Sequence, residues 1–250
     1  MVPQFQKAGV SLYYGDALAV LSALDDNFVD AVLTDPPYSS GGVTLGARQA
    51  DPSQKYQSSG TKRQYPPMLG DAKDQRSWIM WCTLWLSECW RIACDGAPLM
   101  VFTDWRQLPA LSDAVQAAGW SWRGIIAWDK RSARPQIGKF RQQCEYVLFA
   151  TKGRFIPHTR ACLPGVYAHP VISAQKLHLT SKPVGLVEDL LAVTASQAKV
   201  LDPFMGGGSV GEACIRTGRG YVGIELSPEY FAISRKRLES VQAECGNTTE

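Results

Sequence analysis

Short apolar runs alternate along the chain with segments whose apolar residues recur every three or four positions. The runs are typical of buried strands and the periodic segments of amphipathic helices. The pattern predicts strands at 10–14, 29–34, 98–103, 124–128, 145–150, 199–201 and 221–225, and helices at 17–24, 74–93, 108–118, 184–194, 210–216 and 228–241. Because strands and helices alternate, we expect an α/β fold with a Rossmann-like, mostly parallel sheet and helices on both faces. The strands at 124–128 and 145–150 predict one hairpin-like pair within it.

The helix predicted at 74–93 is rich in tryptophan. Trp78, Trp81, Trp85, Cys89 and Ile92 follow one another at intervals of three or four residues. Such a stripe could stack on nucleobases, but large aromatic residues at helical spacing more often belong to a core. We therefore expect this face to pack against the sheet.

The composition limits the class of protein. With 250 residues, 45% of them hydrophobic, the chain can form a single domain, 1–250, with functional insertions. No apolar stretch approaches the roughly 20 residues that span a bilayer, and no signal-peptide pattern begins the chain, so a cytoplasmic protein without a membrane partner is expected. Seven scattered cysteines and three isolated histidines match no metal-binding pattern, so no metal is expected.

The charges are unevenly distributed although the net charge is only +3. Between residues 130 and 160, Glu145 is the single acid among eight lysines and arginines. Such a stretch can follow the phosphates of DNA, and the alternative is an ordinary solvated surface. The residues expected to contact DNA are Lys130, Arg131, Arg134, Lys139 and Arg141.

A glycine-rich turn follows the strand at 199–201. Asp202-Pro203-Phe204 leads into Gly206, Gly207 and Gly208, and Glu225 ends the next strand. An acid about twenty residues beyond the glycines is the ribose-binding position of Rossmann-type sites. The G-x-G-x-x-G fingerprint of nicotinamide cofactors does not match, which favours S-adenosylmethionine (SAM) over a dinucleotide. We expect Asp202 to hold the ammonium group of SAM and Phe204 to pack along its methionine portion, the alternative being a structural turn.

The tetrapeptide Asp35-Pro36-Pro37-Tyr38 directly follows the strand at 29–34. An exocyclic amine of a nucleobase is a poor nucleophile because its lone pair is delocalised into the ring. The Asp35 carboxylate and the Pro36 carbonyl could accept its hydrogens and stabilise the developing positive charge, while the ring of Tyr38 could stack on a flipped base. Two prolines would fix this arrangement, although Asp-Pro-Pro is also a common turn signal.

Together these motifs resemble the β group of DNA amino-methyltransferases, in which the catalytic motif precedes the cofactor motif. The resemblance covers most of the chain and implies that Gly15-Asp16 lies near the cofactor's adenine. It also implies that Trp128-Asp129-Lys130, Phe140 and Glu145 help to wall the target-base pocket. The cofactor-binding residues expected on this basis are Asp16, Ala17, Asp35, Lys182, Asp202, Pro203, Phe204, Gly206, Gly208, Glu225 and Leu226, and the catalytic residues are Asp35, Pro36, Pro37 and Tyr38.

Some parts of the chain depart from the family's usual pattern. The target-recognition region that the resemblance places at 151–177 is short, so either the glycine-, serine- and glutamine-rich segment 39–73 shares recognition or specificity is relaxed. We expect 39–73 to be a flexible loop or lid. Thr103-Asp104-Trp105-Arg106 is similar to a segment of phage and prophage members.

The expected activity is site-specific transfer of a methyl group from SAM to N6 of adenine in double-stranded DNA, with the target base flipped out of the helix. An aspartate-led tetrapeptide favours adenine, and N4 of cytosine is the nearest alternative. Two more distant alternatives are a protein-glutamine methyltransferase and a DNA-binding module without turnover. The resemblance also implies a homodimer.

Overall fold

A computed structural model describes residues 1–38, 75–131, 137–171 and 182–246. Within these residues one sheet has the strand order β1-β2-β9-β8-β3-β4-β6-β5-β7. The strands are β1 (Phe5–Lys7), β2 (Val10–Tyr14), β3 (Ala31–Thr34), β4 (Pro98–Thr103), β5 (Ser121–Asp129), β6 (Cys144–Thr151), β7 (Val166–Ala168), β8 (Lys199–Asp202) and β9 (Gly220–Glu225).

The centre of the sheet is parallel, as the sequence predicts. Strands β2, β9, β8, β3 and β4 are successive parallel neighbours. Strand β6 is antiparallel to β4 and β5, which confirms the predicted hairpin-like pair. The central strands are almost entirely buried because both faces of the sheet are covered.

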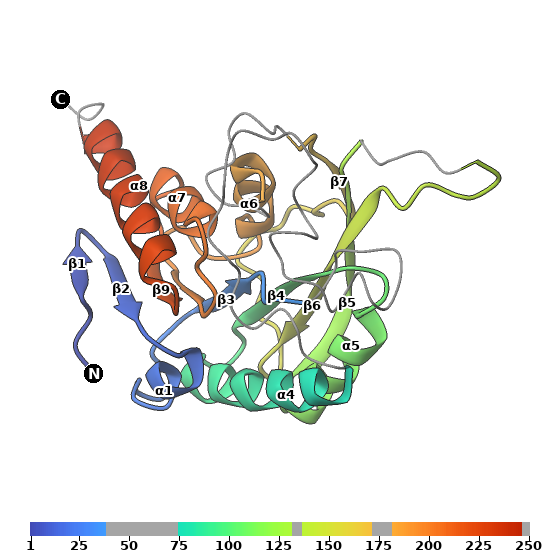
Figure 1. Cartoon of the computed structure of the whole chain (residues 1–250), viewed down its shortest axis with the longest axis horizontal. Helices are drawn as coiled ribbons and strands as arrows, with labels where there is room; N and C mark the ends of the chain where they lie inside the picture. The colour runs from blue at the N-terminus through green and yellow to red at the C-terminus, as the bar shows by residue number, and fades with distance from the viewer. Residues whose placement is uncertain (39–74, 132–136, 172–181, 247–250) are drawn as a thin grey trace.

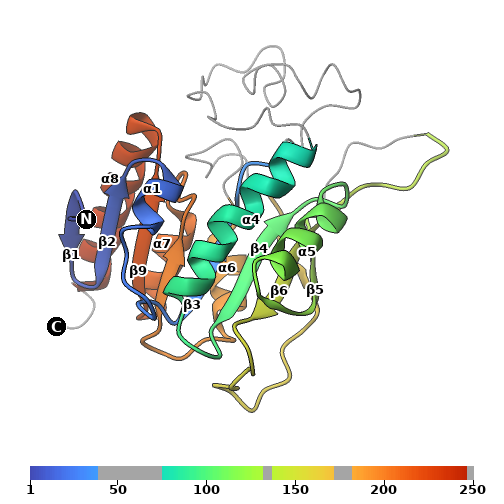
Figure 2. The same ribbon diagram turned by 90° about the horizontal axis from the view of Figure 1, so that it is seen from below.

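Helices cover both faces, and the predicted α/β class is confirmed (Figure 1). Helices α1 (Ala17–Leu21), α4 (Gln75–Ile92) and α5 (Leu108–Ala117) lie on one face, and α6 (Val184–Leu191), α7 (Ser209–Arg216) and α8 (Pro228–Gly246) on the other. Figure 2 shows the first group lying across the sheet. Each group encloses its own hydrophobic cluster against the sheet.

The tryptophan stripe of α4 belongs to the core, as expected. Trp78 and Trp85 are fully buried, and the Nε1 of Trp78 donates to the carbonyl oxygen of Pro37 at 2.7 Å. The packing of α4 therefore also supports the loop that follows β3. None of the helices in the described part of the chain is long and apolar enough to cross a lipid bilayer.

The structure differs from the predicted elements mainly at the sheet edges. The three-residue strands β1 and β7 were not predicted, because so short a segment shows no periodicity. Strand β7 lies inside 151–177 and pairs with β5, so the predicted recognition region contains one strand of the sheet. Helix α1 ends at Leu21 and α6 at Leu191, earlier than predicted, whereas α8 continues to Gly246.

Candidate active site

The predicted motifs meet at the carboxyl ends of the central parallel strands. Asp35 follows the carboxyl end of β3, Asp202 ends β8, and Glu225 ends β9. Because these strands are parallel neighbours, their carboxyl ends point the same way, and the crevice outside such ends is where open α/β sheets bind ligands. Motifs that are far apart in the sequence are thereby gathered in one place.

The glycine turn after β8 has a backbone that requires glycine. Gly206 and Gly208 have φ angles of 51° and 76°, in the left-handed region that side chains disfavour. A Cβ on Gly208 would lie 3.3 Å from the Cβ of Ser234. The Ser234 hydroxyl donates to the carbonyl oxygen of Gly206, which anchors the turn to α8. The turn is therefore fixed against α8 just before α7 begins.

Glu225 and Asp16 lie beside this turn at the ends of adjacent strands. Glu225 Oε2 accepts a hydrogen bond from the backbone N of Gly206 at 2.8 Å, and its Oε1 accepts one from Ser227 N at 2.8 Å. Burial raises the pKa of Glu225. Asp16 caps α1 by accepting from the backbone N of Ala19 at 3.2 Å, and the N of Gly15 donates to the carbonyl oxygen of Glu225.

This cluster fits the nucleoside half of SAM. Glu225 could accept hydrogen bonds from ribose hydroxyls, and Asp16 remains exposed toward solvent. Ala17, which begins α1, is buried, whereas Leu226 is 44% exposed. The structure thus brings together the residues expected around the ribose and adenine.

Asp202 is held by hydrogen bonds from three neighbouring residues. The carboxylate is 1% exposed; Oδ1 accepts from Thr34 Oγ1 at 2.7 Å and from the N of Phe204 at 3.2 Å, and Oδ2 accepts from the Tyr221 hydroxyl at 3.2 Å. Burial raises its pKa to about 7 although these hydrogen bonds act in the opposite direction. Asp202 thus joins β3, β8 and β9 and shapes the turn, and its contact with the ammonium group of SAM stays a prediction.

Phe204 is partly buried against the tryptophans of α4. Its ring centroid lies 5.2 Å from that of Trp81 and 5.1 Å from that of Trp85. The preceding Pro203 is buried. Phe204 therefore lines the rim from the α4 side, where its remaining exposed surface could pack along an apolar chain.

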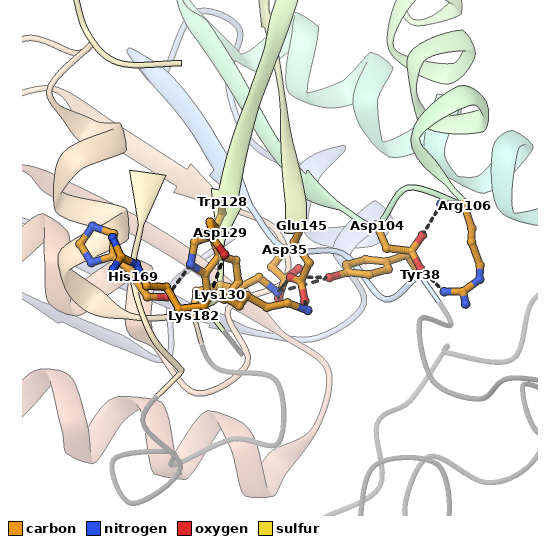
Figure 3. A network of polar contacts seen from close by, with 11 residues as sticks. Asp35, Tyr38, Asp104, Arg106, Trp128, Asp129, Lys130, Glu145, His169 and Lys182 are labelled. Atoms are coloured by element: carbon orange, nitrogen blue, oxygen red, sulfur yellow. Dashed lines mark hydrogen bonds and ion pairs between the residues drawn. The ribbon is translucent and has the colours of Figure 1, made fainter. Parts of the chain in front are cut away.

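Lys182 contacts the catalytic tetrapeptide and not the glycine turn. Its Nζ donates to Asp35 Oδ2 at 2.6 Å and to the Tyr38 hydroxyl at 3.4 Å, and lies 3.4 Å from Glu145 Oε2. Tyr38 is 7% exposed and donates its hydroxyl hydrogen to Glu145 Oε2 at 3.3 Å. Figure 3 shows Lys182 and Glu145 converging on Asp35 and the tip of Tyr38.

The pKa values of Lys182 and Glu145 depend on their ion pairs. Burial alone would lower the pKa of Lys182, but the carboxylates of Asp35 and Glu145 raise it above its ordinary value. Burial alone would raise the pKa of Glu145, but Lys182 and Lys130 hold it below its ordinary value. Lys130 Nζ donates to Glu145 Oε1 at 3.0 Å. Both groups are therefore charged near neutral pH, and they fix the orientation of Asp35 and Tyr38.

Glu145 has a larger role than the sequence suggested. It was expected only in the wall of a base pocket, yet it bridges two lysines beside the carboxylate of Asp35. The available signal was its place as the single acid of the 130–160 stretch, at a strand end. Its partner Lys182, 37 residues later in the chain, gave no such signal.

The residues predicted to contact DNA follow β5 and precede β6 in the sequence. Arg131, Lys139 and Arg141 are exposed, whereas Lys130 is half-buried in its ion pair with Glu145. The described residues 137–143 extend away from the body of the molecule (Figure 1). Arg134, the predicted loop 39–73 and residues 172–177 of the predicted recognition region lie outside the described residues.

Comparison with known proteins agrees with this geometry. A family model described as "DNA methylase" (N6_N4_Mtase) matches residues 29–169 and 158–236. The putative methylase YubD of Escherichia coli (strain K12) is 32% identical over 232 residues, covering 91% of this chain and 89% of that protein.

Two solved structures share the fold. The crystal structure of the M1.HpyAVI–SAM complex has a TM-score of 0.64 at 23% identity, covering 92% of this chain and 100% of that one. The PvuII DNA methyltransferase, described as cytosine-N4-specific, has a TM-score of 0.72 at 15% identity, covering 97% of this chain and 94% of that one.

Proposed function

This chain belongs to the N6/N4 DNA methylase family, and from that premise we propose that it transfers a methyl group from SAM to N6 of adenine in double-stranded DNA. The observation that carries the proposal is the position of Asp35. Its carboxylate lies at the carboxyl end of β3, next to the strand that ends in the glycine turn, and is held by Lys182 at 2.6 Å. The acceptor site and the cofactor site thus share one rim.

The residues of this rim fit SAM. Glu225, Asp16 and the turn at Gly206 and Gly208 would hold the nucleoside portion, and Phe204 would contact the methionine chain. When bound, SAM supplies an electrophilic methyl group on its sulfonium. Because M1.HpyAVI, which shares this fold, was solved in complex with SAM, the same cofactor is proposed here.

Asp35 activates the acceptor amine. Its carboxylate and the carbonyl oxygen of Pro36 would accept the two amine hydrogens, which draws the nitrogen toward tetrahedral geometry. As the nitrogen–carbon bond forms, the carbon–sulfur bond of the methyl donor would break, and its electron pair would stay on the sulfur as a neutral thioether. The positive charge that develops on the nitrogen would be stabilised by the fixed carboxylate. The nitrogen then releases one proton to solvent. Lys182 and Glu145 contribute by holding Asp35 in place before the substrate arrives.

Tyr38 would stack on the flipped base. Its hydroxyl lies within hydrogen-bonding distance of Glu145 and Lys182, so the ring is held at its tip. A fixed aromatic face beside Asp35 would receive an extrahelical base with little loss of side-chain entropy.

The choice of adenine rests on the aspartate that leads the tetrapeptide. The likeness to the cytosine-N4-specific PvuII enzyme keeps N4 of cytosine as the alternative, because the same chemistry serves both amines. We further propose that Lys130, Arg131, Arg134, Lys139 and Arg141 contact the DNA backbone, that 39–73 acts as a lid, that 151–177 contributes to recognition within one domain spanning 1–250, and that the protein forms a homodimer.

Transfer of labelled methyl from SAM to unmethylated genomic DNA, followed by nucleoside mass analysis, tests the proposal. Labelled N6-methyladenine is the expected product. Labelled N4-methylcytosine would instead support the alternative, methylation of cytosine. SAM binding without any labelled nucleoside would contradict DNA methylation. Label on protein glutamine would then indicate a protein methyltransferase, and no label at all a DNA-binding module without turnover.

A further inference from the structure

The segment Thr103–Arg106, at the carboxyl end of β4, has no part in the chemistry above. Asp104 is 6% exposed, and its Oδ1 accepts hydrogen bonds from the backbone N atoms of Arg106 and Gln107, both at 3.0 Å. Its Oδ2 accepts a charged hydrogen bond from Arg106 Nη1 at 3.2 Å. One buried carboxylate therefore fixes both the turn into α5 and the guanidinium of Arg106.

The fixed guanidinium covers part of the Trp105 ring. Its Cζ lies 4.7 Å from the ring centroid, which is cation–π distance. Trp105 nevertheless remains 46% exposed. Unlike the buried tryptophans of α4, this indole is supported by a guanidinium and presents the rest of its surface to solvent.

The position of this pair on the rim suggests its partner. Strand β4 lies between β3, which leads to Asp35, and β6, which carries Glu145, and Thr103 is paired with Tyr146. Figure 3 shows Asp104 and Arg106 in the same row of side chains as Tyr38 and Glu145. The segment that holds Trp105 therefore follows the strand next to the one that leads to Asp35.

We propose that Trp105, backed by Arg106, is a stacking plate for an unstacked nucleobase of the DNA. The inference rests on the proposed function and adds a binding element to it. Every nucleobase has a π-face, so an indole can stack on any of the four bases. The adjacent guanidinium favours a polyanion over an apolar partner, and because Asp104 has already ordered Arg106, little entropy is lost on binding.

Trp105→Ala provides the test, with Trp122→Ala as a matched control. Trp122 is 40% exposed, but it lies near the start of β5 and pairs with Ala150, which places it at the opposite end of the strands from Thr103. For a duplex oligonucleotide at saturating SAM, Trp105→Ala should raise KM by about 5- to 100-fold. Trp105→Phe should recover most of the loss, and Trp122→Ala should leave KM unchanged.

Two further measurements separate stacking from other effects. Calorimetric binding of SAM should be equal in wild type and Trp105→Ala, which shows an intact fold. The slope of log KM against log salt should also be unchanged, because no charge is removed. Equal KM values for Trp105→Ala and Trp122→Ala, or a reduced salt slope in Trp105→Ala, would overturn the stacking plate.

The base on the plate is the flipped target or a neighbour exposed by flipping. With 2-aminopurine at the target position in one duplex and beside it in another, the fluorescence change on binding should differ between wild type and Trp105→Ala at one of the two, which identifies the base. No difference at either position overturns the inference. If wild-type protein methylates no DNA, the proposed function fails first, and the affinities of the two alanine variants for DNA still decide whether the plate exists.

Discussion

Lys182 Nζ lies 2.6 Å from Asp35 Oδ2, which joins residues 147 positions apart in the sequence. The lysine begins the approach to α6, whereas the aspartate follows β3. The family resemblance placed Lys182 among the cofactor ligands, and this contact joins it to the tetrapeptide Asp35–Tyr38. In the structure Lys182 forms ion pairs with the carboxylates of Asp35 and Glu145.

Replacing Lys182 should therefore slow transfer more than it weakens SAM binding. In Lys182→Met we expect transfer to fall about 10- to 100-fold, with SAM affinity within about threefold of wild type, because Asp35 loses its positioning partner. The variant also leaves Glu145 with one fewer cation, so the free energy of unfolding should drop by about 3 kcal/mol. Adding Glu145→Gln should restore stability but not the rate. A large loss of SAM affinity with an unchanged rate would return Lys182 to the cofactor site.

Removing the carboxylate of Asp35 should abolish the chemistry and spare the cofactor. Asp35→Ala should lower single-turnover transfer by at least about 100-fold, because the acceptor that stabilises the developing charge is gone. Calorimetry should show nearly unchanged SAM binding. If affinity for SAM falls as far as the rate does, Asp35 serves mainly as a cofactor ligand.

The buried carboxyl of Asp202 should make stability depend on pH. Burial raises the folded pKa of this carboxyl to about 7, above its ordinary value of 3.8, so the folded state binds the proton more tightly. The stabilising contribution is present below about pH 4 and is lost as the pH rises through about 7. Asp202→Asn, which cannot ionise, should flatten this slope, and relative to wild type it should be more stable at pH 8 than at pH 4, by on the order of 2–4 kcal/mol. Urea unfolding at pH 4, 6 and 8 measures the effect, and parallel pH profiles for both proteins would contradict it.

The glycine turn should tolerate no side chain at position 208. Gly208→Ala adds a Cβ at φ 76°, 3.3 Å from the Cβ of Ser234, so it should lose at least about tenfold in SAM affinity and roughly 1–2 kcal/mol in stability. Gly218→Ala is the matched control, because its φ is 70° but no heavy atom lies within 4 Å of the added Cβ. Both variants should lose stability, and only the first should lose cofactor affinity. Equal SAM binding in the two would place the cofactor elsewhere.

The arginines between β5 and β6 in the sequence should govern the salt dependence of DNA binding. Replacing Arg131, Arg134 and Arg141 with alanine should weaken binding and reduce the slope of log K against log salt by up to about 3, since each phosphate contact contributes close to one. Arg235→Ala on α8 is the control, because that exposed arginine pairs with Glu239 on the other side of the molecule. Fluorescence anisotropy over a salt series gives the slopes. An unchanged slope in the triple variant would show that DNA binds elsewhere on the protein.

The sequence by itself determined what local pattern can determine. The alternation of apolar runs and helical periods gave the α/β class, because strands buried on both faces and amphipathic helices leave different periodicities. The positions of Asp35–Tyr38 and of the Gly206–Gly208 turn followed from the strands before them. The edge strands β1 and β7 were not predicted, because a three-residue segment shows no periodicity. Such a strand forms only through its pairing with a neighbouring strand.

Tertiary structure alone decided what each charged residue contacts. Asp202 stands in a motif that suggests a ligand for the cofactor, yet its hydrogen bonds to Thr34 and Tyr221 bury it between three strands. Lys182 and Glu145 meet at Asp35 only because β3 and β6 flank β4 and the chain returns to this rim before α6. Burial and pairing depend on contacts between distant segments, and no local pattern of residues encodes them.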